Sequence, residues 1–179
     1  MPTFDGTKIP IQCTFPESPP SEFPEGESKI EETENQVVYL FRKEYRADPY
    51  RERVVIRYWN EGNHPNFERI AEERGGTSPL DAALDYYFRE LVQKESNASK
   101  LNKTATSQGN IGPNRIYISE TQTFEFAHER LGSFTGQLIV FGVANNYVTM
   151  EFYAHAGRYQ TYERLMETIK STIQLKGVQ

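Results

Sequence analysis

The stretch 114–154 constrains the fold most, because apolar and polar side chains alternate along most of it. Alternation with a period of two is typical of β-strands, whose successive side chains point to opposite faces of a sheet. We divide the stretch into three strands, 114–129, 133–143 and 147–154, and a tight turn at 144–146 joins the last two. The middle strand is apolar on both faces, which predicts a central position in its sheet.

Helical periodicity separates these strands from an earlier β-rich part of the chain. Ser78 is a favourable N-cap, the proline that follows it favours the first helical position, and apolar residues at 3.6-residue spacing continue to about residue 94. A second helix is predicted over 158–173, and a shorter one over 66–74.

The first 60 residues predict three strands and a long acidic loop. Residues 8–15 alternate, and Pro10 favours an edge strand or the start of a strand. Residues 36–45 and 51–59 are strongly β-forming, and the Asp-Pro turn between them predicts a hairpin. The intervening stretch 16–35 is acidic and rich in proline, which predicts an exposed loop.

These elements predict a single α+β domain over residues 1–179, in which helices pack on an antiparallel β-sheet in the order βββ-α-βββ-α. Residues 95–114 are polar and rich in turn-forming residues, so we expect a connection between the first long helix and the following strands.

The last third of the chain resembles the end of PsbP-like and DcrB-like domains. The resemblance rests on "GQLIVFGVANNYVTMEFYA" followed by "YERLMETIKSTIQL", and on "IPIQCTFPESPP" as an opening strand that enters a proline-containing loop. It covers roughly half of the chain and implies an α/β/α sandwich around an antiparallel sheet. Members of that group are mostly not enzymes. They include photosystem assembly subunits, a Ran-binding factor, envelope lipoproteins, and adaptors or chaperones of bacterial type VI secretion.

Residue patterns typical of metal, cofactor or nucleophile sites are missing from the sequence. The three histidines are far apart, and no other ligand-type residues accompany them at metal-binding spacing. No phosphate-binding glycine loop and no nucleophile elbow is present. The single cysteine, Cys13, lies in an apolar alternation that predicts a small core residue. We therefore expect no metal, no cofactor and no enzymatic activity.

One acidic residue leaves an alternative open. Glu151 shares a strand face with Tyr147, Thr149 and Tyr153. An acid among tyrosines is either a buried general acid with a tuned pKa or a surface acid beneath a tyrosine. We favour the surface acid.

The strand 51–59 supplies the candidate binding site. Its even residues face one side, and its odd residues place three arginines and the only tryptophan on the other. Arginine and tryptophan often dominate protein interfaces. The simpler interpretation is that the arginine stems cover Val55 while their charged ends remain in water. The candidate protein-binding residues are Arg51, Arg53, Arg57, Trp59 and Tyr45.

We therefore predict a non-catalytic protein-binding domain of the adaptor or chaperone type, whose partner is another protein. Its second candidate site is a cleft between the sheet and helix 79–94. A carrier of a small apolar ligand, or an enzyme of unrecognised type, are the alternatives.

Charge and hydropathy limit the other partners. The net charge of −5 argues against nucleic acid, and no apolar run is long enough to span a membrane. The acidity belongs to residues 1–36, which alone carry −6. No secretion signal opens the chain, so we expect a cytoplasmic protein, or a periplasmic or secreted one if a signal was removed.

Overall fold

A seven-stranded antiparallel β-sheet dominates the computed structural model, which describes residues 3–15, 29–40, 53–94, 100–128 and 132–177. The strands are β1 (Thr3–Asp5), β2 (Ile11–Thr14), β3 (Lys29–Glu32), β4 (Gln36–Leu40), β5 (Arg53–Trp59), β6 (Lys100–Ile111), β7 (Tyr117–His128), β8 (Gly132–Val143), β9 (Asn146–His155) and β10 (Gln174–Leu175). The helices are α1 (Phe67–Glu73), α2 (Pro79–Tyr87), which continues as a π-helical segment (Phe88–Gln93), and α4 (Tyr159–Thr172); Pro113–Arg115 and Ala156–Arg158 form 3₁₀ turns.

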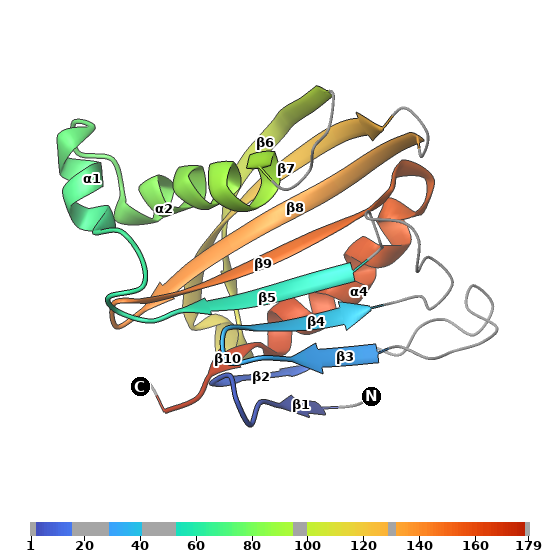
Figure 1. Ribbon diagram of the computed structural model, residues 1–179, viewed down its shortest axis with the longest axis horizontal. Helices are drawn as coiled ribbons and strands as arrows, with labels where there is room; N and C mark the ends of the chain where they lie inside the picture. The colour runs from blue at the N-terminus through green and yellow to red at the C-terminus, as the bar shows by residue number, and fades with distance from the viewer. Residues whose placement is uncertain (1–2, 16–28, 41–52, 95–99, 129–131, 178–179) are drawn as a thin grey trace.

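Three layers are stacked in the order helix, sheet, helix (Figure 1). The large sheet has the strand order β3-β4-β5-β9-β8-β7-β6. One of its faces packs on α4 and on a small sheet of order β1-β2-β10, and the other packs on α1 and α2. The predicted α+β class and the sandwich around an antiparallel sheet are confirmed.

The strand β8 lies near the centre of the sheet, as its apolar composition predicted. Leu138 and Val140 pack in the cluster under α2, while Ile139 and Phe141 pack in the cluster under α4. All four are completely buried. A strand that is covered on both faces needs apolar residues at consecutive positions, which is the pattern in the sequence.

The N-terminus of α2 also forms as the sequence indicated. The Oγ of Ser78 accepts hydrogen bonds from the backbone N–H groups of Leu80, at 3.1 Å, and Asp81, at 3.3 Å. A serine cap of this kind satisfies donors that have no partner inside the helix. The cap fixes where the helix begins, and therefore where the side chain of Asp81 lies.

The element order contains more strands than predicted. Five strands precede the helices, because the short segments β1 and β3 pair with β2 and β4. Within the predicted acidic loop, residues 29–32 form β3, and residues 16–28 lie outside the described residues.

The prediction of a connection at 95–114 was wrong for most of its length, because residues 100–111 form the strand β6 at the edge of the large sheet. Residues 102–110 are all exposed. Between Leu101 and Ile111 the strand therefore carries no buried face, and no apolar alternation marks it in the sequence.

Candidate functional site

The odd residues of β5 lie on the same side of the sheet as α2. Trp59 packs in the cluster under α2, whereas Val54 and Ile56 pack in the opposite cluster with α4. Figure 1 shows α2 over the part of the sheet formed by β6, β7 and β8, with β5, β4 and β3 beyond it. We call this part, which α2 does not cover, the arginine face; it is formed by Gln36, Val38, Arg53, Val55 and Arg57, and its two valines are buried.

Three of the five predicted binding residues belong to the described structure. Arg53, Arg57 and Trp59 follow one another along the same face of β5, and all three are half-buried. The other two, Arg51 and Tyr45, lie outside the described residues. The strand therefore places Arg53 and Arg57 on one face, four positions apart, and Trp59 extends the row toward α2.

A buried ion pair engages Arg57. Its Nη1 lies 2.7 Å from Oε2 of Glu151, and only 12% of the arginine side chain and 6% of the glutamate side chain are exposed. The strand register explains the contact, since β5 and β9 place Arg57 opposite Thr149 and Glu151 opposite Val55. Our interpretation of Glu151 as a surface acid was wrong. It lies on a central strand with only 6% of its side chain exposed, and Arg57 compensates its charge.

Trp59 also makes contacts inside the protein. Its Nε1 donates a hydrogen bond to Oγ1 of Thr149 at 3.1 Å, and its ring centre lies 4.9 Å from that of Tyr87 in α2. The hydroxyl of Tyr87 is buried, and this desolvation raises the pKa of Tyr87 far above its ordinary value. Trp59 therefore links β5 to the end of α2.

Arg53 differs from Arg57 in its surroundings. It lies between Leu40 of β4 and Tyr153 of β9 in the strand register. Its Nε is buried and has no hydrogen-bond partner among the described residues. A buried guanidinium donor without an acceptor is unfavourable, so Arg53 would gain from an additional carboxylate or carbonyl oxygen.

A second acidic side chain is buried beneath α2. Glu120 of β7 is 1% exposed, and Gln108 of β6 donates a hydrogen bond to its Oε1 at 3.0 Å. Burial and the neighbouring carboxyl group of Asp81 raise the pKa of Glu120 to about 7, and the negative charge of Asp85 adds to the effect. Burial and nearby negative charge both disfavour the ionised form of a carboxyl group. The pair therefore favours a protonated Glu120.

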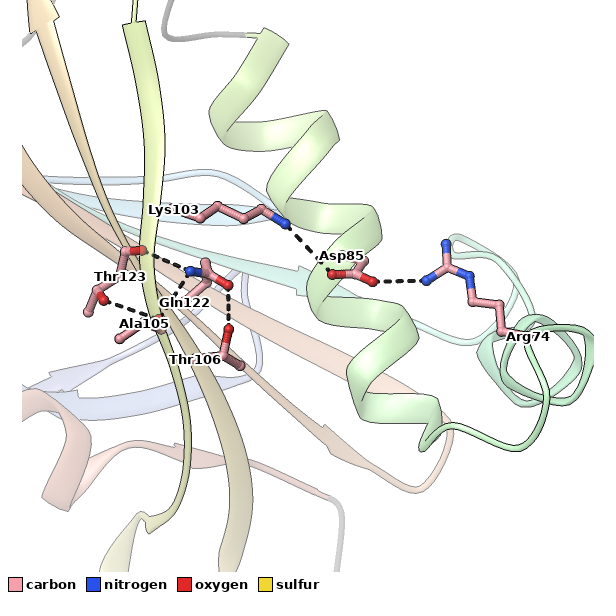
Figure 2. A network of polar contacts seen from close by, with 7 residues as sticks. All are labelled: Arg74, Asp85, Lys103, Ala105, Thr106, Gln122 and Thr123. Atoms are coloured by element: carbon pink, nitrogen blue, oxygen red, sulfur yellow. Dashed lines mark hydrogen bonds and ion pairs between the residues drawn. The ribbon is translucent and has the colours of Figure 1, made fainter.

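Further polar contacts link α2 to the edge strand β6, and β6 to its neighbour β7 (Figure 2). Asp85 accepts from Nη1 of Arg74 at 3.0 Å, and its other oxygen lies 3.8 Å from Nζ of Lys103. Beside them, Gln122 accepts from Thr106 at 2.6 Å and donates to the backbone oxygen of Ala105 at 3.0 Å. These charged and neutral contacts join α2 to β6, and β6 to β7.

The predicted cleft between the sheet and helix 79–94 is filled by side chains. Tyr87 and Phe88 of the helical segment pack against Phe124 and Phe134 of the sheet, and all four are completely buried. The rings of Phe88 and Phe124 meet edge to face at 5.7 Å. The prediction of a cleft at this interface was therefore wrong, since aromatic residues there form a core.

Two surface hollows lie away from the arginine face. One, of about 320 Å³, is lined by residues that include His64, Phe67 and Tyr147. The other, of about 310 Å³, lies beside Phe126 and Phe134 at the far end of β7 and β8. Among the residues that the structure describes, no three histidine, cysteine or acidic side chains are grouped as metal ligands.

The single thiol lies in the core. Cys13 is 1% exposed, and burial raises its pKa to about 12. A thiol with such a pKa carries almost no thiolate at neutral pH, so it is not activated as a nucleophile. Its place in the core agrees with the apolar role that the sequence indicated.

Comparison with known proteins identifies the fold. No protein-family model and no curated protein matches the sequence. The solution structure of cyanobacterial PsbP (CyanoP) from Synechocystis sp. PCC 6803 matches with a TM-score of 0.62 and 10% identity, over 97% of this chain and 91% of that one. A crystal structure from Bacteroides thetaiotaomicron VPI-5482 matches with a TM-score of 0.52 and 12% identity, over 97% of this chain and 48% of that one.

The fold is therefore PsbP-like, as the sequence resemblance implied. TM-scores of 0.62 and 0.52 show a shared fold, and at identities of 10% and 12% the function has to be argued from this chain's own residues. Within the described part of the chain, no helix combines the length and the hydrophobicity that a membrane crossing requires.

Proposed function

We propose that this chain is a non-catalytic protein-binding domain of the adaptor or chaperone type, and that its partner contacts the arginine face. The observation that carries the proposal is the environment of Arg53. It lies on the part of the sheet that α2 leaves uncovered, and its buried Nε has no acceptor among the described residues.

The chemistry of this face favours a partner segment that carries an acidic residue. Arg53 offers a planar set of donors that matches a carboxylate. Val38 and Val55 form a small apolar cluster beside it, apart from the two main cores. The ion pair between Arg57 and Glu151 then holds the neighbouring part of the strand in place.

These residues support an enzyme less well than they support a binding domain. Glu120, whose pKa is raised to about 7, is 1% exposed and lies under α2. A general acid must come within hydrogen-bond distance of its substrate, directly or through one water molecule. We therefore assign Glu120 a structural role, and adaptor function of the kind known among type VI secretion proteins remains our proposal.

Charge reversal of Arg53 should abolish partner binding. Proteins captured from an extract of the source cells by the immobilised chain are compared by quantitative mass spectrometry with those captured by the Arg53→Glu variant. We expect at least one protein to be recovered by the wild type and reduced roughly 10-fold or more by Arg53→Glu, because a glutamate repels the partner's carboxylate.

Arg164→Glu is the matched control, because it makes the same charge change on an exposed position of α4, behind the sheet. Circular dichroism and urea unfolding establish that both variants are folded. Equal recovery of every captured protein by Arg53→Glu and the wild type would rule out the arginine face as the binding surface.

A further inference from the structure

The two edges of the large sheet differ in length and charge. The edge strand β3 has four residues, Lys-Ile-Glu-Glu, so three of them are charged. The opposite edge strand, β6, has twelve residues and pairs only with β7 among the described strands. Short length and charge protect a sheet edge from pairing with another chain. The edge strand β3 is both short and charged, whereas β6 is long.

The central part of β6 also lacks charge. Residues 104–110 read Thr-Ala-Thr-Ser-Gln-Gly-Asn and contain no charged residue and no proline. They are exposed on both faces of the strand. The one local irregularity is a bulge between Lys103 and Ala105, at the start of this segment. The residues after the bulge form a regular, neutral edge of the kind that accepts an additional strand.

Side-chain contacts hold this edge in a fixed shape. Thr106 and Gln108 bind Gln122 and Glu120 of β7, at 2.6 Å and 3.0 Å. Figure 2 shows the contacts of Thr106 and Ala105 with Gln122, and Lys103 reaching Asp85 of α2. An edge that is already ordered loses little conformational entropy when another strand binds.

We propose that β6 pairs with β6 of a second copy of this chain, antiparallel and around a two-fold axis at Ser107. This register places Thr106 of each copy opposite Gln108 of the other, and Ala105 of each copy opposite Gly109 of the other. It places Thr104 opposite Asn110, and Lys103 opposite the apolar Ile111. The two strands then bring no like charges together, and hydroxyl and amide side chains meet across the seam.

A second copy fits this edge better than a foreign peptide because the segment is complementary to itself. A two-fold axis requires the same segment to serve as both partners. Here the bulky polar residues Thr106 and Gln108 meet each other, and the small residues Ala105 and Gly109 meet each other. The product is one continuous sheet through both copies, with the helix layers on matching faces.

Sedimentation of the full chain over a roughly 100-fold range of concentration tests the proposal. We expect a monomer that converts to a dimer as concentration rises. Ser107→Lys should weaken the dimer roughly 10-fold or more, because two ammonium groups then meet at the axis, and Ser107→Glu should weaken it in the same way. Mixing these two variants should restore a dimer, because opposite charges now meet.

Ser171→Lys, at an exposed position of α4, is the control and should leave the dimer unchanged. Three results would each overturn the proposal: a wild-type chain that stays monomeric over the whole range, a dimer that persists in both Ser107 variants, or a mixture of the two variants that remains monomeric. If the wild-type chain stays monomeric, a strand from another protein is the remaining occupant for this edge.

Discussion

The variant Glu151→Gln is expected to lower the free energy of unfolding by about 3 kcal/mol at pH 7, because it removes the carboxylate that compensates a largely buried Arg57. The N–O distance of 2.7 Å and the low exposure of both side chains place this pair in a poorly solvated region. A buried charge that loses a carboxylate there keeps its desolvation cost. Urea unfolding monitored by circular dichroism measures the effect.

Glu73→Gln provides the control for this experiment. Glu73 pairs with Arg69 on the surface of α1, where 63% of the glutamate side chain is exposed, so the loss should be about 0.5 kcal/mol or less. Replacing both members of the buried pair, as Arg57→Met with Glu151→Leu, should restore much of the lost stability. Similar losses for Glu151→Gln and Glu73→Gln would contradict a buried pair.

Glu120 should make the protein less stable as the pH rises from about 4.5 to about 7. Its folded-state pKa of about 7 lies above the ordinary value of 4.5, so in this interval the folded protein keeps a proton that the unfolded chain has released. The full shift corresponds to about 3 kcal/mol of stability, present at low pH and lost above pH 7. Glu120→Gln should therefore be more stable than the wild type at pH 8 and show a flatter pH dependence.

The control is Glu125→Gln, on the same strand but exposed on the opposite face. It should follow the wild-type pH dependence of stability. Urea midpoints measured between pH 5 and pH 8 compare the three proteins. A Glu120→Gln variant with the wild-type pH profile would show that Glu120 is ionised in the folded protein throughout this range.

Sequence patterns predicted the elements that carry a buried stripe or a capped end. The consecutive apolar residues of β8 and the Ser78 cap of α2 each reflect a local physical requirement that the structure meets. The edge strand β6 escaped prediction for the opposite reason. With both faces exposed, its pairing depends on backbone and side-chain contacts with β7, and these contacts are not visible in its own sequence.

The candidate site was predictable in part. The parity of β5 correctly placed Arg53, Arg57 and Trp59 on one face, because side-chain direction alternates along a strand. The partners of these residues depend on the register between β5 and β9, which joins positions 94 residues apart and has no local signal. The signal for Glu120 was its even position on the strand of Phe124 and Phe126, which placed an acid on an apolar face.

Photo-crosslinking tests the central claim most directly, that a partner protein contacts the arginine face. Gln36 lies opposite Arg57 on this face, whereas Gln160 is exposed on α4 behind the sheet. A benzophenone amino acid is placed at one position or the other, and each chain is irradiated in an extract of the source cells. We expect a discrete protein adduct from position 36 and none from position 160. An adduct from position 160 alone would contradict the claim.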